Sequence, residues 1–243
     1  MNKNVIIRQI QVKDVMTKSN APIGGYCVNP YVGCTHGCKY CYASFMKRFT
    51  GHTEEWGSFL DIKRCDKQLK DIDCYVKIST KSSLILRDLE LLKQFHHLTV
   101  DMSINTFDDD FRRDMDRGSS IEERLRTIKL FHEYGIETVL FMSPCFPGIT
   151  DFREIMEASV SFIDKFWFEN LNLRGDYKQR ILAYIHEKCP QLDELYQAIY
   201  VKNNETYWLE MEREFTQYCE DRSIRFVNAF YHSKLVVEKV GKS

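Results

Sequence analysis

The run Gly33-Cys34-Thr35-His36-Gly37-Cys38-Lys39-Tyr40-Cys41-Tyr42 decides how the rest of the chain is interpreted. It places Cys34, Cys38 and Cys41 in a C-x3-C-x2-C spacing on one short loop. Three thiolates at such spacing can bind three irons of a [4Fe–4S] cluster. Because no fourth cysteine follows at ferredoxin spacing, the fourth iron of such a cluster would stay open to a small molecule.

Two other interpretations of this loop remain open. A zinc site takes four nitrogen or sulfur ligands, typically in two separated pairs, and His36 inside the loop is the candidate for the fourth ligand. The cysteines can also be structural, as a disulfide pair with one spare thiol. Cys27, Cys65, Cys74, Cys189 and Cys219 are interpreted as packing residues.

Composition describes an ordinary globular protein. The 243 residues are 44% apolar and 28% charged, which suits one domain with a sizeable core. No apolar run approaches the ~20 residues of a membrane span, so no membrane association is expected. The net charge of -1 does not support a nucleic-acid partner.

The cysteine count bears on the compartment. Nine cysteines form an odd set without the spacing of a disulfide framework, which suits a reducing environment. The N-terminal residues Met1-Asn2-Lys3-Asn4 lack the apolar stretch of a signal peptide. A cytoplasmic protein is therefore expected.

Strand-like and helix-like segments alternate along the chain, which predicts parallel βα units in an α/β fold. The expected strands cover residues 26–32, 58–63, 74–80, 98–105, 137–143 and 166–173. The expected helices cover residues 43–49, 83–95, 121–134 behind a capping box of Ser120 with Glu123, and 152–163. After residue 175 the pattern predicts helices over 176–188, 191–201 and 205–221, and a last edge strand over 224–230.

Several of these strands have one apolar and one polar face. In the fourth strand Thr99, Asp101, Ser103 and Asn105 alternate with apolar residues. Because helices must cover the apolar face, we expect the polar face to line an internal cavity. A lone buried ammonium is costly, so Lys77 on the third strand is expected to pair with Asp101. An open antiparallel sheet with one solvated face is the alternative.

The cysteine run resembles the signature of the radical S-adenosylmethionine (SAM) enzymes, Cys-x3-Cys-x-aromatic-Cys, with Tyr40 as the aromatic residue. The wider sequence is similar to the spore photoproduct lyase branch over about residues 26–175. The segments that carry this likeness are Asn29-Pro30-Tyr31-Val32-Gly33-Cys34, Tyr40-Cys41-Tyr42-Ala43, Thr80-Lys81-Ser82, Leu86-Arg87-Asp88-Leu89 and Pro147-Gly148-Ile149-Thr150-Asp151.

The resemblance implies a partial (β/α)6 barrel. Residues 1–175 would form the core barrel, with one βα unit short or missing between Trp56 and Lys81. Residues 176–243 would form a C-terminal helical extension packed on the core, within a single domain.

The resemblance also implies a reaction. A [4Fe–4S] cluster on Cys34, Cys38 and Cys41 would cleave SAM reductively to a 5′-deoxyadenosyl radical, which would abstract hydrogen from an unknown substrate. An external one-electron reductant such as flavodoxin or ferredoxin would supply the electron.

Residues for SAM follow from the same likeness. The implied contacts are Tyr40, Lys81, Ser103, Asn105, Met142, Ser143, Asn172 and Arg174. Cys145 is a candidate for returning a hydrogen atom to a product radical, with an inert buried thiol as the other interpretation. The Gly-Gly-Glu element that many members use for the SAM amino group is absent from the sequence. A non-catalytic or electron-transfer iron–sulfur protein, or a zinc-stabilised binding module, is therefore kept as an alternative.

Overall fold

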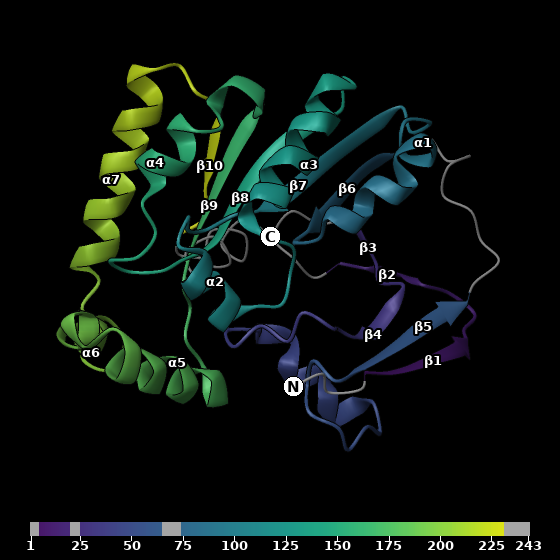
Figure 1. Ribbon diagram of the computed structural model, residues 1–243, viewed down its shortest axis with the longest axis horizontal. Helices are drawn as coiled ribbons and strands as arrows, with labels where there is room; N and C mark the ends of the chain where they lie inside the picture. Colours follow the sequence, from purple (N-terminus) through teal and green to yellow (C-terminus); the bar gives the residue numbers. More distant parts are fainter. Residues whose placement is uncertain (1–4, 20–24, 65–73, 231–243) are drawn as a thin grey trace, which may run out of the picture. The chain divides into compact units, whose positions relative to one another are not determined.

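The computed structural model describes residues 5–19, 25–64 and 74–230, whose contacts belong to two compact units (Figure 1). The smaller unit comprises residues 1–69, 115–117 and 231–243, and the larger unit comprises residues 70–114 and 118–230. The predicted division at residue 175 stays a prediction. Residues 231–243 of the predicted extension lie outside the described residues, as does Cys65.

The smaller unit contains two small sheets. Strand β5 (Phe59–Arg64) pairs in parallel with β1 (Ile6–Gln11) and antiparallel with β4 (Tyr31–Gly33). Strands β2 (Met16–Lys18) and β3 (Tyr26–Val28) form an antiparallel pair. The single strand expected over 26–32 is wrong, because β3 and β4 are separated at Asn29-Pro30, and proline cannot donate to a ladder. The sequence analysis missed β1 and β2.

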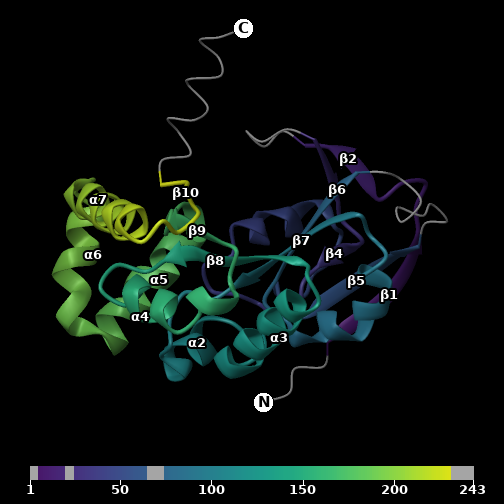
Figure 2. The same ribbon diagram turned by 90° about the horizontal axis from the view of Figure 1, so that it is seen from above.

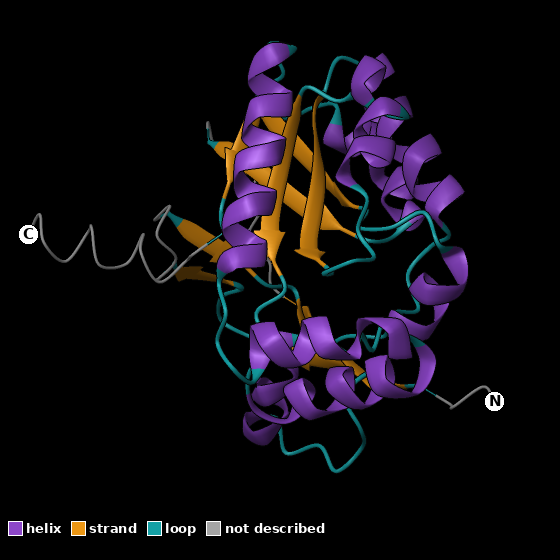
Figure 3. Cartoon of the chain, turned by 90° about the vertical axis from the view of Figure 1, so that its left-hand side faces the viewer, coloured by secondary structure: helices purple, strands orange, loops and turns teal. Residues whose placement is uncertain are grey.

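The larger unit is built on one parallel sheet of five strands, ordered β10-β9-β8-β7-β6. These strands are β6 (Tyr75–Thr80), β7 (His97–Ser103), β8 (Glu137–Cys145), β9 (Lys165–Asn170) and β10 (Phe226–Asn228). In Figure 3 they are neighbouring orange arrows beside purple helices. The predicted α/β class with parallel strands is confirmed, and so is the edge strand near the C-terminus. The open antiparallel alternative is wrong.

Helices connect these strands, and four more helices lie between β9 and β10 (Figure 2). They are η1 (Tyr42–Phe49) in the smaller unit and η2 (Ser83–Asp88), α1 (Leu89–Leu92), α2 (Asp109–Met115), α3 (Ile121–Glu133), α4 (Phe152–Glu157), η3 (Val160–Phe162), α5 (Gly175–Lys188), η4 (Pro190–Leu192), α6 (Asp193–Tyr200) and α7 (Thr206–Asp221). Within the described ranges, every helix is too short or too polar to cross a bilayer.

Helix α3 shows how local sequence sets the core. The predicted capping box of Ser120 and Glu123 is present, and Gly135 follows the helix with a φ of 74°. Ile128 and Phe131 on its inner face are buried, as are Val100 and Met102 on β7. The helix predicted over 152–163 is wrong in one respect, because it ends at Glu157 and leaves Val160 44% exposed.

Candidate functional site

The cysteine loop is held by a segment far from it in sequence. The backbone N–H of Lys39 donates to the carbonyl of Met115 at 2.9 Å, and the N–H of Arg117 donates to the carbonyl of His36 at 2.9 Å. The phenol of Tyr40 donates to Asp116 Oδ2 at 3.1 Å. Residues 115–117 therefore fix the loop that carries the three thiols.

A second contact holds the other side of the loop. Gly57 has a φ of 100°, and a Cβ on it would lie 2.7 Å from the Cα of Gly37. The two backbones can approach this closely because residue 57 is glycine and carries no Cβ. The Arg117 guanidinium also donates to the Gly57 carbonyl at 3.4 Å. The segment at residue 57 thus lies directly against the loop.

The three cysteines form no disulfide in the described structure and are half-buried, and Cys41 has the best defined surroundings. Burial raises the pKa of the Cys41 thiol. The N–H of Ala43 and the indole N–H of Trp56 lower this pKa, whereas the nearby Cys34 raises it. The indole nitrogen of Trp56 is itself buried and lacks a hydrogen-bond partner in the described structure. Donors around a cysteine sulfur favour its thiolate, which is the form that binds metal.

The three thiols on this loop are a donor set that a [4Fe–4S] cluster can use. In the described residues, no three or more His, Cys, Asp and Glu side chains are grouped so as to bind one metal ion. A [4Fe–4S] cluster does not need such convergence, because each thiolate binds a different iron. His36 is bound through its carbonyl to Arg117. The donor set of three thiols on one loop, with a buried N–H near Cys41, fits the cluster.

The larger unit has a polar edge where β6, β7 and β8 end. The Lys81 ammonium donates to Ser103 Oγ at 2.5 Å, and Ser103 Oγ donates to the carbonyl of Ser143 at 3.2 Å. The Ser143 hydroxyl donates to Glu169 Oε2 at 2.6 Å. Three of the predicted SAM contacts are therefore joined in one chain of hydrogen bonds that ends at a carboxylate on β9.

Asn105 and Met142 belong to the same edge. The Asn105 amide donates to the Pro144 carbonyl at 3.1 Å, directly after Ser143. Met142 is fully buried on β8 beside Ser143. The structure thus places five predicted residues on β7, on β8 or directly after β6 and β7, at one edge of the sheet.

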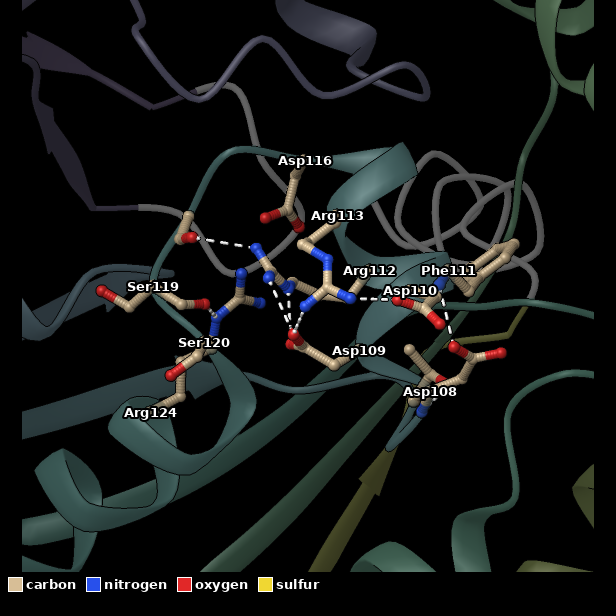
Figure 4. Close-up of polar contacts among 12 residues, drawn as sticks. Asp108, Asp109, Asp110, Phe111, Arg112, Arg113, Asp116, Ser119, Ser120 and Arg124 are labelled. Carbon is tan, nitrogen blue, oxygen red and sulfur yellow. Dashed lines mark hydrogen bonds and ion pairs between the residues drawn. The ribbon is translucent and has the colours of Figure 1, made fainter.

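Arg124 supports this edge, and the sequence analysis missed it. Its guanidinium is 1% exposed and donates to the carbonyl of Ser103 at 3.0 Å and to that of Ser119 at 2.8 Å. Figure 4 shows Arg124 beside the turn at Ser119 and Ser120. A basic residue three positions after Ile121 on an otherwise apolar helix face was the signal in the sequence.

Neighbouring arginines on α2 have structural partners. In Figure 4, Arg112 and Arg113 both point to Asp109. Arg112 also donates to the Gly118 carbonyl at 3.2 Å. Their charges are therefore used in fixing the turn that follows α2.

The sheet face behind the polar edge carries the predicted internal ion pair. Lys77 Nζ lies 2.7 Å from Asp101 Oδ2, and it also lies 4.0 Å from the centre of the Trp167 ring. The Asp101 side chain is fully buried, and its Oδ1 has no hydrogen-bond partner in the described structure. Burial raises the pKa of Asp101, whereas Lys77 and Ser79 lower it. The predicted pairing of Lys77 with Asp101 is confirmed.

The remaining predicted residues lie elsewhere. Asn172 accepts a hydrogen bond from Arg174 at 3.0 Å, and its carbonyl accepts one from Tyr177, so both residues shape the start of α5. The Cys145 thiol is buried and donates to the Met142 carbonyl at 3.3 Å.

The other cysteines differ in exposure. Cys219 is buried, while Cys74 and Cys189 are half-buried. The interpretation of Cys27 as a packing residue is wrong, because it is exposed on β3.

The polar edge has the chemistry that SAM requires at its amino-acid end. Lys81 offers an ammonium for a carboxylate, and Glu169 offers a carboxylate for an amino group. A charge-assisted hydrogen bond is roughly twice as strong as a neutral one. Glu169 was not singled out in the sequence, and it supplies an acidic group although the Gly-Gly-Glu element is absent.

Comparison with known proteins shows what part of the chain is similar to. Residues 58–158 match the model of the radical SAM superfamily, a range that begins after the cysteine loop. An uncharacterised protein of Methanocaldococcus jannaschii is 29% identical over 231 residues, covering 80% of this chain and 88% of that protein.

The fold is similar to that of spore photoproduct lyase. Two structures of spore photoproduct lyase with dinucleoside spore photoproduct, one of them a variant, have TM-scores of 0.51 and 0.53, each at 14% identity over 74% of this chain. Streptococcus suis SuiB bound to SAM has a TM-score of 0.49 at 13% identity over 93% of this chain. The chain spans 33% to 66% of the length of the solved structures that it matches.

Proposed function

We propose that the chain is a radical SAM enzyme that binds a [4Fe–4S] cluster and SAM, and the family-model match over residues 58–158 supports this proposal. When both are bound and the cluster is reduced, they supply a 5′-deoxyadenosyl radical that abstracts hydrogen from a substrate. The observation that carries this proposal is the half-buried cysteine loop, fixed on one side by residues 115–117 and on the other by Gly57.

In this proposal Cys34, Cys38 and Cys41 bind the cluster. The fixed loop lowers the entropy lost on binding, because the thiols are already ordered. Half-burial limits the access of water and oxygen to the sulfur atoms. Tyr40 holds the loop through Asp116, so its side chain acts as a positioning group.

The polar edge of the larger unit is proposed to bind SAM. Lys81 and Ser103 would hold the carboxylate and Glu169 would accept from the amino group, while the fully buried Met142 would support this edge from the core. Ser143 and Asn105 orient these groups through their hydrogen bonds. Asn172 and Arg174 are proposed to contact the ribose or the substrate from the start of α5.

The substrate stays unassigned. The net charge of -1 gives no support for binding of nucleic acid. A small acidic electron carrier such as flavodoxin or ferredoxin is proposed as the reductant. Cys145 is proposed as a packing residue, because its thiol is already bonded to a carbonyl in the core.

The test is anaerobic reconstitution with iron and sulfide, followed by reduction with dithionite in the presence of SAM. The proposal predicts about four irons per chain, a brown colour and formation of 5′-deoxyadenosine. The variant C34A/C38A/C41A should lose all three. A wild-type cluster without 5′-deoxyadenosine would favour an electron-transfer or non-catalytic iron–sulfur protein, and zinc without iron would favour a zinc-stabilised module.

A further inference from the structure

We propose that the indole N–H of Trp56 donates a hydrogen bond to the Cys41 thiolate and thereby raises the reduction potential of the cluster. This inference rests on the proposed function, because it concerns the cluster that Cys41 would bind. Trp56 lies outside the cysteine motif, so the motif alone gives no reason to assign it a role. Its contribution would be to tune the cluster rather than to bind it.

The first argument is position. Trp56 directly precedes Gly57, whose backbone lies against Gly37 in the cysteine loop. Gly37 stands between Cys34 and Cys38. Trp56 is therefore the direct neighbour of the residue that contacts the cysteine loop, and the close contact of the two glycines limits how far it can move away.

The second argument is the rigidity of the ring. Trp56 meets Phe59 edge to face, with ring centres 5.8 Å apart and planes at 87°. Phe59 stacks in turn on His52 with centres 3.9 Å apart. The His52 ring is fixed by Glu54 at 2.9 Å and by Asp61 at 3.0 Å. The indole thus sits at the end of a packed stack and keeps one orientation.

The third argument is the state of the indole N–H. This group can only donate, and in the described structure its nitrogen is buried without a hydrogen-bond partner. A buried donor without an acceptor costs about 1–3 kcal/mol. This N–H and the backbone N–H of Ala43 both lower the pKa of the Cys41 thiol. The Cys41 sulfur is therefore the acceptor that we assign to the indole. A thiolate is a better acceptor than a thiol, so ionisation on cluster binding would strengthen the contact.

The consequence for the cluster follows from charge. Reduction adds one electron, and part of the added negative charge lies on the cysteine sulfurs. A donor near a sulfur stabilises the reduced form more than the oxidised form, and hydrogen bonds to the sulfurs are among the factors that set the potential of such clusters. Loss of the Trp56 N–H should therefore lower the potential and make the cluster harder to reduce.

The experiment compares W56F with wild type after anaerobic reconstitution. Phenylalanine keeps an aromatic ring against Phe59 and removes the N–H. We expect full iron content and an equilibrium constant for reduction about tenfold lower, which is about 59 mV for one electron. The readout is an anaerobic redox titration followed by the EPR signal of the reduced cluster, and it requires neither SAM nor substrate.

The control is W208F, because Trp208 is a buried indole in the larger unit. W208F should leave the potential unchanged. If W56F does not fold or does not bind iron, 3-benzothienylalanine incorporated at position 56 keeps the shape of indole and removes only the N–H. It should give the same decrease.

The outcomes separate the two proposals. A wild-type protein that binds a cluster, with an unchanged potential in W56F or in the benzothienyl variant, overturns the role of Trp56 and leaves the proposed function intact. A wild-type protein that binds no cluster overturns both. A decrease in W56F that W208F matches also overturns the inference, because the effect would then be unspecific.

Discussion

Removing the Lys77 ammonium should destabilise the protein, because the carboxylate of its partner Asp101 stays buried and loses its counter-charge. In K77M, the fully buried Asp101 keeps the hydroxyl of Ser79 as a donor, at 3.1 Å, and among the residues that the structure describes its second oxygen has no partner even in the wild type. Breaking a buried ion pair costs about 3–5 kcal/mol. The Lys77 side chain is 37% exposed, so solvent screening reduces this figure.

We expect a loss of about 2 kcal/mol from the ion pair after that reduction. The lost cation–π contact with Trp167 adds about 0.5–1 kcal/mol. At about 2–4 °C per kcal/mol for a chain of this size, thermal unfolding followed by circular dichroism should shift down by about 4–12 °C. K93M is the matched control, since Lys93 also pairs with a carboxylate and an aromatic ring, but on the surface. It should change stability by less than about 1 kcal/mol.

Two further measurements make this prediction strict. Burial already raises the pKa of Asp101, and loss of Lys77 should raise it further. A carboxyl with a folded pKa above its unfolded pKa loses stability as pH rises, so the K77M deficit should be smaller at pH 5 than at pH 8. The double variant K77M/D101N should recover at least half of the loss. The reasoning fails if K77M unfolds like wild type. It also fails if K77M/D101N loses as much stability as K77M and D101N lose separately when added together.

Three other changes have defined outcomes. R124M should lower the free energy of unfolding by about 2–4 kcal/mol, because the buried carbonyl of Ser103 and the half-buried carbonyl of Ser119 lose their donor. R124K should recover part of this loss in urea unfolding. The pKa of His52 is raised, mainly by its hydrogen bond to the Asp61 carboxylate. The stability that His52 contributes is therefore fully present below its unfolded pKa and is lost as pH rises through its folded pKa. H52N should cost more stability at pH 6 than at pH 9. G57A should reduce iron incorporation, because the new methyl group meets the Gly37 backbone. G51A, at a position that also has a positive φ (71°) but has open space around it, should not. Equal iron content in both variants would refute the close-contact argument.

The α/β class was predictable because it depends on local periodicity. The alternation of polar and apolar residues over β7 predicted both its faces and the Lys77–Asp101 pair, and the capping box predicted the start of α3. These features can be predicted from the residues within one helix or strand, or from the charges on two neighbouring strands. Strand β1 was missed because Ile6–Gln11 is half exposed and alternates only weakly.

The supports of the site could not be predicted in this way. The Cys34, Cys38 and Cys41 motif is compact in sequence, but its fixed conformation depends on residues 115–117. Trp56 and Arg124 act through backbone groups or thiols that lie far away along the chain. Such contacts follow from tertiary packing, for which neither residue type nor spacing gives a direct signal.

The hydrogen bonds of the polar edge explain how a charged ligand could enter at low cost. Lys81 and Glu169 have opposite charges, and each is bonded to a serine hydroxyl in the structure. A hydroxyl can both donate and accept, so Ser103 and Ser143 satisfy these charges before a ligand arrives. A carboxylate that replaces Ser103 at Lys81, or an ammonium that replaces Ser143 at Glu169, exchanges a neutral partner for a charged one. Binding of a molecule with both groups would therefore strengthen two contacts at once without leaving either protein charge buried and alone at any stage.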